Sequence, residues 1–316
     1  MGGEIRHNWS YDEVKAVYDL PLLELLHKAQ NVHRAHHDPT KVQRCTLLSV
    51  KTGACPEDCK YCSQSSRWNT GLERESLMPV DSVMQAAQRA KDQGATRFCM
   101  GAAWRQAKKG KAFDEVLDMV RGVASLDMEV CVTLGMLDEE QAEQLKEAGL
   151  TAYNHNLDTS REFYPEVITS RSYDDRLKTI KNVQDAGISV CCGGILGLGE
   201  SADDRVSLIA TLATMKPHPE SVPINKLVKI DGTPLEDADD LDIFELVRTI
   251  ATVRILIPKA RVRLSAGRLS LSKEGQAMCF LAGANSIFFG DSLLTTPNPQ
   301  VEQDMRFLEE LGLVTA

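Results

Sequence analysis

The regular alternation of β-rich and helical segments is the feature that most restricts the fold of this chain. Eight short runs with the composition of strands recur along the sequence, and each is separated from the next by a segment with helical periodicity. The expected strands lie near Val42–Val50, Thr96–Gly101, Glu129–Thr133, Ala152–Asn156, Ile188–Ile195, Ser221–Lys229, Arg261–Ser265 and Ser286–Phe289. The expected helices lie at Asp81–Gln93, Phe113–Leu126, Asp138–Ala148, Tyr173–Ala186, Ala202–Met215, Asp240–Leu256 and Lys273–Leu281. This order predicts parallel strands with helical crossovers, and an α/β fold of the (β/α)8 TIM-barrel type fits it better than an open doubly wound sheet.

The ends of the chain add helices to this barrel. Two amphipathic helices are expected between Tyr11 and His36, before the first strand, and another at Val301–Leu313. No linker, low-complexity tract or repeat divides the remaining sequence. We therefore predict an N-terminal helical extension over residues 1–40 and a single barrel domain over residues 41–316, a normal length for an α/β barrel.

Charge and cysteine content narrow the class of protein. The net charge of −9 argues against a nucleic-acid or anionic-membrane partner, since either would need a basic face. No run approaches the ~18 apolar residues of a membrane span, and Met1–His7 lacks the apolar core of a signal peptide. Nine cysteines, an odd number, then indicate a reducing cytoplasm and metal binding rather than disulfides.

Three cysteines lie close together directly after the first expected strand. Cys55, Cys59 and Cys62 have the spacing C-x3-C-x2-C within a loop of small and polar residues. Three thiolates can hold a soft metal site and leave one metal position open for chemistry, whereas a closed site needs four ligands. The alternatives are a zinc knuckle completed by a distant ligand, or three unrelated buried thiols. The position after a strand places the loop at the C-terminal face of a barrel, where active sites lie.

Alternation along the strands predicts a second group of thiols inside the barrel. Three cysteines point inward by this count: Cys99, Cys131 and Cys191. Cys192 falls on the apolar, helix-facing side of its strand. Singly, each inward cysteine is better explained as a small core residue, but three on separate strands can converge on one metal centre. Cys45 and Cys279 have no such partners and are expected to be packing residues.

Polar side chains are predicted to share this interior. Arg97 and Arg263 face inward, and since a guanidinium stays protonated, they are expected to be charge partners of the thiolates. The residues alone therefore leave a fourth metal ligand unassigned. Asn156 and Asn225 also lie on inward faces, where the simplest role for an asparagine is to cap a turn or a strand end.

Six motifs taken together are typical of one enzyme family. They are Lys51–Cys62, Arg97–Trp104, Tyr153–Thr159, Gly193–Glu200, Pro223–Asn225 and Val262–Arg268. Through them the chain resembles the biotin synthase family of radical S-adenosylmethionine enzymes over essentially its whole length. The resemblance implies a homodimeric barrel sulfurtransferase that inserts sulfur between C6 and C9 of dethiobiotin. It further implies S-adenosylmethionine cleavage at a [4Fe–4S] cluster, a [2Fe–2S] cluster as sulfur donor, and an electron donor such as flavodoxin or ferredoxin.

The resemblance also assigns roles to individual residues. It implies that Cys55, Cys59 and Cys62 bind the [4Fe–4S] cluster, and that Cys99, Cys131, Cys191 and Arg263 bind the [2Fe–2S] cluster. It implies S-adenosylmethionine contacts from Tyr61, Gly101, Ala102, Ala103, Asn156, Asp158, Arg176 and Ile195, and dethiobiotin contacts from Asn156 and Asn225. No residue is expected to act as a general acid or base, and His155, the best candidate, is predicted to be structural. The family commonly has serine at the position of Cys192.

Two other functions compete with this one. A different radical S-adenosylmethionine barrel, such as a lyase or mutase, would have no need of inward cysteines on three strands. An iron–sulfur electron carrier or scaffold would close its cluster with four thiolates and would not need a barrel cavity. Iron and sulfide content distinguishes the predicted enzyme from such a lyase or mutase. Binding of S-adenosylmethionine distinguishes it from an electron carrier or scaffold.

Overall fold

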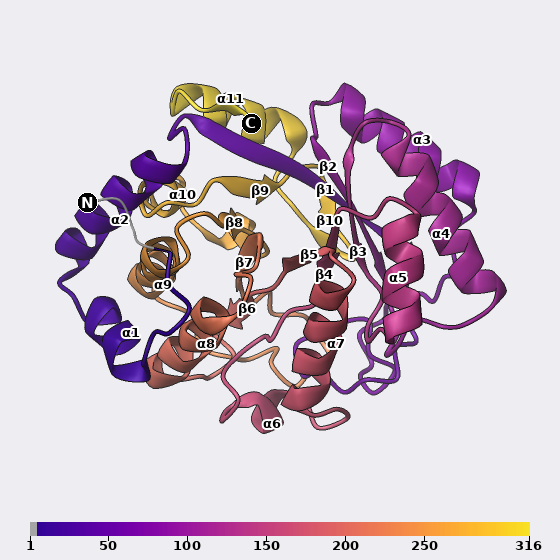
Figure 1. Cartoon of the computed structure of the whole chain (residues 1–316), viewed down its shortest axis with the longest axis horizontal. Coiled ribbons are helices and arrows are strands. Elements are labelled where there is room, and N and C mark those ends of the chain that lie inside the picture. The colour runs from indigo at the N-terminus through magenta and orange to yellow at the C-terminus, as the bar shows by residue number, and fades with distance from the viewer. Residues whose placement is uncertain (1–4) are drawn as a thin grey trace.

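The parallel strands of this protein close into a barrel surrounded by helices (Figure 1). The computed structural model describes residues 5–316. Met1–Glu4, part of the segment that argued against a signal peptide and of the predicted extension, lies outside the described residues. None of the helices formed by residues 5–316 has the length and apolar character needed to cross a bilayer.

The barrel has eight strand positions, one of which is divided into two segments. The strands are β1 (Lys41–Lys51), β2 (Arg97–Ala102), β3 (Glu129–Thr133), β4 (Ala152–Asn154), β5 (Ser189–Cys191), β6 (Gly194–Leu196), β7 (Ser221–Lys226), β8 (Arg261–Leu264) and β9 (Ser286–Phe288). Neighbours pair in parallel from β1 through to β9, and β9 pairs back with β1. The predicted (β/α)8 barrel is therefore confirmed.

Helices follow the strands much as the sequence indicates. They are α1 (Tyr11–Tyr18), α2 (Leu22–His36), α3 (Val80–Asp92), α4 (Lys111–Ala124), α5 (Glu139–Glu147), α6 (Tyr164–Val167), α7 (Tyr173–Asp185), α8 (Ala202–Thr214), α9 (Ile243–Leu256), α10 (Lys273–Leu281) and α11 (Val301–Glu310). Several begin at a capping box, as where Ser172 and Asp175 bond reciprocally at the start of α7. The helix expected from Asp240 begins later, because Asp242 caps it by accepting from the amide of Phe244.

The strand expected at Ile188–Ile195 is interrupted between β5 and β6. The carbonyl of Gly193 accepts from the amides of Leu157 and Asp158, so it bonds to the segment after β4. A Cβ at position 193 would lie 1.9 Å from the Pro223 carbonyl oxygen, and only glycine allows this close approach. Periodicity indicates a strand here but cannot detect such a break.

Short elements near the C-terminus were also not predicted. The 3-10 turn η1 (Arg268–Ser270) follows β8, and β10 (Ser292–Leu293) and β11 (Thr296–Pro297) form an antiparallel hairpin after β9. A last strand, β12 (Val314–Thr315), pairs with the start of β1. Segments of two or three residues have too little sequence pattern to be recognised.

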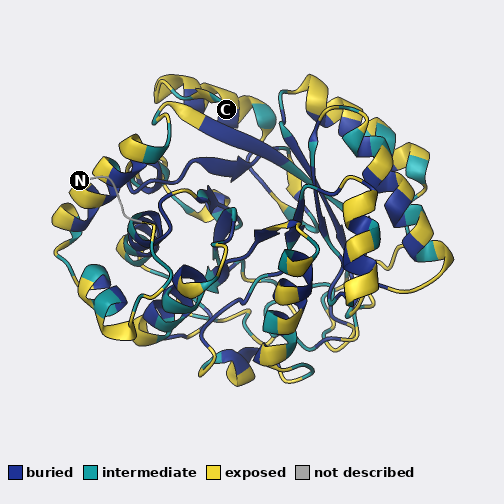
Figure 2. Cartoon of the chain, in the orientation of Figure 1, coloured by how far each residue is buried: buried dark blue, intermediate teal, exposed yellow. Residues whose placement is uncertain are grey.

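Apolar packing occupies the layer between strands and helices (Figure 2). Phe98 and Met100 on β2, with Val130 and Val132 on β3, are buried in this layer. The N-terminal helices α1 and α2 pack on the outside of α8 and α9 (Figure 1). Because the apolar side of each strand faces outward to the helices, polar and sulfur-containing side chains remain for the barrel interior.

Candidate active site

A cavity of about 320 Å³ opens at the C-terminal ends of the barrel strands. Its wall includes all three cysteines of the loop, Cys55, Cys59 and Cys62. It also includes Cys99, Cys131 and Arg263 from the barrel interior. The two groups of thiols that the sequence separates by dozens of residues therefore border one space.

Backbone hydrogen bonds fold the cysteine loop on itself. The backbone amide of Cys55 donates to the carbonyl of Gln64. The carbonyl of Cys59 accepts two hydrogen bonds, one from the backbone amide of Cys62 and one from Trp68 Nε1 at 2.9 Å. Burial raises the pKa of Cys59 to about 12 and that of Cys62 to about 11. Both thiols are therefore protonated in the metal-free chain, and metal binding must displace their protons.

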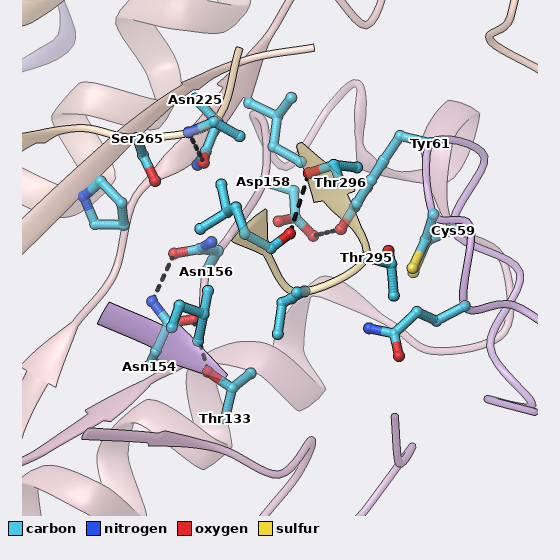
Figure 3. A pocket seen from close by; sticks show the side chains of 18 of the residues that line it. Cys59, Tyr61, Thr133, Asn154, Asn156, Asp158, Asn225, Ser265, Thr295 and Thr296 are labelled. Carbon is cyan, nitrogen blue, oxygen red and sulfur yellow. Dashed lines mark hydrogen bonds between the residues drawn. The ribbon is translucent and has the colours of Figure 1, made fainter. Parts of the chain in front are cut away.

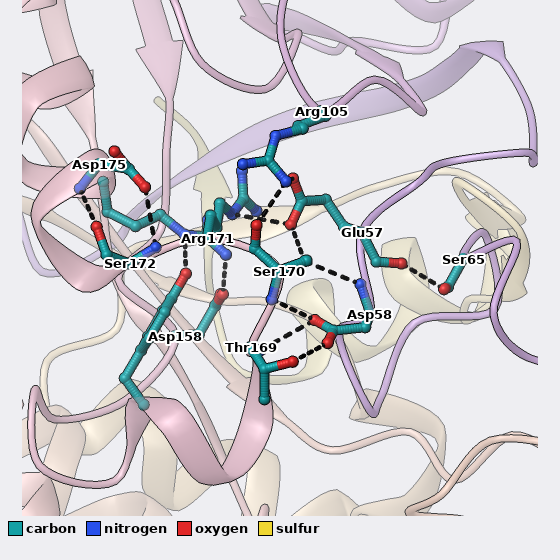
Figure 4. A network of polar contacts seen from close by, with 12 residues as sticks. Glu57, Asp58, Ser65, Arg105, Asp158, Thr169, Ser170, Arg171, Ser172 and Asp175 are labelled. Atoms are coloured by element: carbon teal, nitrogen blue, oxygen red, sulfur yellow. Dashed lines mark hydrogen bonds and ion pairs between the residues drawn. The ribbon is translucent and has the colours of Figure 1, made fainter.

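A second loop holds the cysteine loop in place (Figure 4). Asp58 accepts from the amides of Thr169 and Ser170 at 3.0 and 2.9 Å, and Ser170 Oγ donates to Glu57. Glu57 also pairs with Arg171 at 3.7 Å. Sequence reasoning missed this network because its two halves lie more than a hundred residues apart, and an acidic pair between cysteines resembles any solvated loop.

Tyr61 and Asp158 meet at the cavity wall (Figure 3), and Arg176 joins them to form a connected group. Tyr61 Oη donates to Asp158 Oδ2 at 3.0 Å, and Arg176 Nη2 donates to the same oxygen at 2.5 Å. Arg176 also bonds to the carbonyl of Asn156 at 2.8 Å. The resemblance assigns four of these residues to S-adenosylmethionine, and they lie together although they come from three separate segments of the chain: Tyr61, Asn156, Asp158 and Arg176.

The interior thiols converge as alternation predicts. Cys99, Cys131 and Cys191 are buried in one cluster inside the barrel, whereas Cys192 packs in the apolar layer outside it. The thiol of Cys131 contacts those of both Cys99 and Cys191. Strand register therefore selects the inward cysteine of the adjacent pair correctly.

The expectation that Cys45 has no cysteine partner is wrong. Cys45 on β1 belongs to the same interior cluster, and its thiol contacts that of Cys99. Periodicity predicts the face on which Cys45 lies but not its neighbours around a barrel, so the sequence does not indicate this contact. Cys279 on α10 is buried in the apolar layer, as expected.

The two inward arginines differ in their contacts. Arg263 lies against thiols, with Nη2 3.2 Å from Cys45 Sγ and Nη1 3.7 Å from Cys191 Sγ. Arg97 instead bonds to carboxylates, to Glu129 at 2.8 Å and to Glu220 at 2.9 Å, and acts on the thiols through its charge. A hydrogen bond from Cys131, aided by the charge of Arg263 against the cost of burial, lowers the pKa of Cys191 to about 6. The interior can therefore hold thiolates.

These donor sets fit iron–sulfur clusters better than a single ion. Among residues 5–316, no three His, Cys, Asp or Glu side chains are arranged around one metal ion. A [4Fe–4S] cluster takes one protein ligand per iron and a [2Fe–2S] cluster two, so neither requires such an arrangement. Inside the barrel, Arg97 Nη1 and Ser221 Oγ are buried without a hydrogen-bond partner. A cationic donor and a hydroxyl left unpaired beside thiols suit an anionic group.

Three asparagines line the cavity (Figure 3), and one of them, Asn154, also reaches an interior thiol. Asn154 Nδ2 lies 3.3 Å from both Cys191 Sγ and Asn156 Oδ1, and Asn156 Oδ1 also accepts from the amide of Gly193. Asn225 bridges two strand ends, donating to the Gly194 carbonyl and accepting from the amide of Ala266. Asn156 and Asn225 therefore combine the capping role with a place on the wall, and Asn154 is an additional wall residue.

The remaining predicted residues lie at the rim or close behind it. Ala102, Ala103 and Ile195 line the cavity. Gly101 packs directly beneath Leu294. His155 lines the wall, but burial and the neighbouring Arg176 hold its pKa well below the usual value, so its imidazole stays neutral.

The hairpin of β10 and β11 completes the wall and was not predicted. Four hairpin residues line the cavity, Leu293, Leu294, Thr295 and Thr296, and Figure 3 labels the two threonines. Thr295 Oγ1 lies 2.8 Å from Ser63 Oγ in the cysteine loop. The only sequence signal is a cluster of threonines and prolines after the last barrel strand. The C-terminal region therefore contributes to the site and not only to the scaffold.

Two family models match the chain in succession. Residues 49–212 match the Radical SAM superfamily, and residues 223–314 match the Biotin and Thiamin Synthesis associated domain. Solved structures of methylornithine synthase (PylB) and of the hydrogenase maturase HydG from Carboxydothermus hydrogenoformans share the fold, with TM-scores of 0.80 and 0.82. The first is 18% identical and the alignment covers 97% of this chain and 94% of PylB; the second is 16% identical, with 98% and 76% covered.

Curated relatives are far more similar in sequence. Biotin synthase from Myxococcus xanthus is 60% identical over 312 residues, covering 99% of this chain and 90% of the relative. Biotin synthase from Cytophaga hutchinsonii is 59% identical, covering 98% of this chain and 92% of the relative. With this identity along nearly the whole length, and with both family models matched, the chain belongs to the biotin synthase family of radical S-adenosylmethionine enzymes.

Proposed function

We propose that this enzyme converts dethiobiotin to biotin by inserting sulfur between C6 and C9. The observation that carries the proposal is the single cavity bordered by two thiol sets of different geometry. One set lies on a folded loop and offers three ligands, while the other is spread over separate strands. A carrier or scaffold would require neither a shared cavity nor two kinds of site.

Each of the two thiol sets would hold one of the two iron–sulfur clusters. Cys55, Cys59 and Cys62 would hold the [4Fe–4S] cluster with one iron free for S-adenosylmethionine. Inside the barrel, Cys99, Cys131 and Cys191 would hold the [2Fe–2S] cluster beside Arg263. When bound, these groups supply an electron, a hydrogen-abstracting radical and a sulfide. The chain supplies position and a closed surround.

The polar wall would bind the two organic molecules. The side-chain oxygens of Asp158 and Asn156 would accept hydrogen bonds from the ribose hydroxyls of S-adenosylmethionine. The guanidinium of Arg176 would pair with its methionine carboxylate. Tyr61, Gly101, Ala102, Ala103 and Ile195 would contact the remainder of that molecule. Asn156 and Asn225 would face the ureido ring of dethiobiotin. No side chain needs to act as a general acid or base, and the neutral His155 agrees with this.

The proposal extends to the context of the enzyme. It includes a homodimer in the cytoplasm and an electron donor such as flavodoxin or ferredoxin. It also treats residues 1–40 as an extension and residues 41–316 as one catalytic barrel domain.

Anaerobic reconstitution with iron and sulfide tests the function. The loaded protein is incubated with dethiobiotin, S-adenosylmethionine and a reductant, and mass spectrometry follows the organic products. We expect biotin together with methionine and 5′-deoxyadenosine. Cys279→Ala is the matched control, because this buried cysteine lies outside both thiol sets. S-adenosylmethionine cleavage without biotin would instead favour another radical enzyme.

A further inference from the structure

We propose that Tyr18, on helix α1 outside the barrel, is a positioning residue for S-adenosylmethionine and acts through Arg205 and Glu200. This inference rests on the proposed function, since it concerns a molecule bound at that site. Tyr18 does not line the cavity itself. Its hydroxyl would instead fix the turn after strand β6, which forms part of the cavity wall.

The phenol of Tyr18 is held in one place on the outer side of α8 and α9 (Figure 1). Its hydroxyl accepts from Arg205 Nε at 3.0 Å and donates to Glu245 Oε2 at 2.9 Å. Burial raises the pKa of this hydroxyl above its usual value, so it keeps the proton that it donates. Arg248 Nη1 donates to the carbonyls of Tyr18 and Leu20 and so anchors the end of α1.

The guanidinium of Arg205 also contacts Glu200, which holds a tight turn. Arg205 Nη1 donates to Glu200 Oε1 at 2.9 Å, and its Nη2 pairs with Glu245 at 2.8 Å. Glu200 in turn accepts from the amides of Gly197 and Leu198, at 3.1 and 2.7 Å. A buried carboxylate that accepts two amides fixes the backbone of this turn. The α1 network is the group of four side chains that connects these contacts: Tyr18, Glu245, Arg205 and Glu200.

Strand β6 lies directly before this turn and is bonded to the polar wall. Ile195 on β6 lines the cavity, and its amide donates to the carbonyl of Asp158 at 2.8 Å. The carbonyl of Gly194 accepts from Asn225 at 2.9 Å. The proposed function gives Asp158 to the ribose of S-adenosylmethionine. A displacement of the turn should therefore move groups that would bind this molecule.

Loss of the Tyr18 hydroxyl should produce such a displacement. In Tyr18→Phe the Nε of Arg205 loses its acceptor, although the Arg205 side chain is only 9% exposed. An unpaired buried donor is costly, so the guanidinium should shift to share the carboxylates of Glu245 and Glu200. That shift changes the position of the Glu200 carboxylate and of the turn it holds. The aromatic ring remains, so the packing of α1 is kept.

Equilibrium dialysis of the anaerobically reconstituted full-length protein with labelled S-adenosylmethionine, without reductant, measures the dissociation constant. We expect Tyr18→Phe to raise it by about fivefold, with the iron content unchanged. Tyr11→Phe is the matched control, because this tyrosine lies on the same helix and bonds to Asp203, outside the α1 network. Val14→Ala removes buried packing from α1 and should lower the unfolding temperature without changing the dissociation constant.

A double substitution tests whether Tyr18 acts through Glu200. In a Glu200→Gln background, Tyr18→Phe should cause no further loss of affinity, because the contact that holds the turn is already weakened. If Glu200→Gln does not fold, Arg205→Lys replaces it, since lysine keeps the charge but cannot contact Tyr18 and Glu200 together.

Three results would overturn the proposal. They are an unchanged dissociation constant in Tyr18→Phe, an equal loss of affinity in Val14→Ala, and full additivity of the two substitutions in the double variant. Each of them leaves the proposed function intact if the wild-type protein still forms biotin. A reconstituted wild-type protein that does not bind S-adenosylmethionine would contradict the proposed function itself.

Discussion

Two adjacent cysteines on one barrel strand face opposite environments. Cys191 contacts the thiol of Cys131 and the amide of Asn154 inside the barrel, whereas Cys192 lies in the apolar layer under the helices. The consequence of replacing each should therefore differ, although the two side chains are identical and equally buried.

We predict that Cys191→Ala abolishes the absorption of the interior [2Fe–2S] cluster after reconstitution, while Cys192→Ala keeps it. Cys192→Ala should only lower the free energy of unfolding, by about 1 kcal/mol, for the lost packing. Visible spectroscopy and denaturant unfolding measure the two effects. Loss of the cluster from Cys192→Ala alone would mean that the strand register is wrong by one residue.

The ion pair of Asp158 and Arg176 is a second place where a single substitution should change both stability and ligand binding. Both side chains are almost completely buried, and Asp158 also accepts from Tyr61. Asp158→Asn should lower the free energy of unfolding by about 3 kcal/mol, because it leaves a buried guanidinium without its carboxylate. It should also weaken S-adenosylmethionine binding in calorimetry.

Asp174→Asn is the matched control for this change. Asp174 also pairs with an arginine, Arg161 at 2.8 Å, but both side chains are exposed to solvent. An exposed pair contributes at most about 1 kcal/mol. Equal effects of the two substitutions on unfolding would contradict the role given to burial at Asp158.

At the scale of elements, the cysteine loop depends on the loop before α7. Burial opposes the charge of Asp58, but hydrogen bonds from Thr169 and Ser170 outweigh it and hold the pKa of this carboxyl at about 2. Asp58→Ala should therefore loosen the cysteine loop without removing a ligand. We expect faster loss of iron from the [4Fe–4S] cluster to a chelator, with Glu73→Ala, an exposed acid nearby, unchanged from wild type. Identical rates for Asp58→Ala and wild type would refute this coupling.

The packing of α2 on α9 should make stability depend on pH. His33 on α2 is buried with neither ring nitrogen bonded, and burial and the nearby Arg254 lower its pKa to about 3. The unfolded chain takes up this proton near pH 6.5, so stability is full above that value and falls as pH drops toward 3. His33→Leu should remove up to about 2 kcal/mol of the loss between pH 7 and 5. Denaturant unfolding at pH 7 and pH 5 measures this difference, with His27→Leu, a change at an exposed histidine, as the control. An unchanged pH dependence of stability in His33→Leu would disprove the assignment.

At the scale of the whole molecule, the two thiol sets share a cavity but belong to different elements. Their clusters should therefore be lost separately. We predict that Cys59→Ala abolishes reductive cleavage of S-adenosylmethionine, since three ligands are needed to hold the [4Fe–4S] cluster, while the interior absorption persists. Product analysis and the spectrum of the reconstituted protein check both parts. Cleavage at the wild-type rate would remove the basis of the proposed function.

Several features of this protein were determined by the sequence alone. Alternating strand and helix patterns were enough to predict the parallel barrel, because crossover connections leave few other arrangements. Alternation within strands separated Cys191 from Cys192, since the side-chain period of a strand is two. Local spacing alone was enough to predict a metal-binding loop at Cys55, Cys59 and Cys62, and this remains a prediction.

Other features were decided only by the tertiary structure. Which inward residues meet depends on the stagger of neighbouring strands around a closed barrel, and no single strand carries that information. For this reason Cys45 was predicted to be a packing residue, although it lies against Cys99 and Arg263. The support of Asp58 by the loop before α7, and the place of the β10–β11 hairpin on the cavity wall, likewise depend on contacts between distant segments. Such contacts form only when the barrel closes and brings its C-terminal loops to one face.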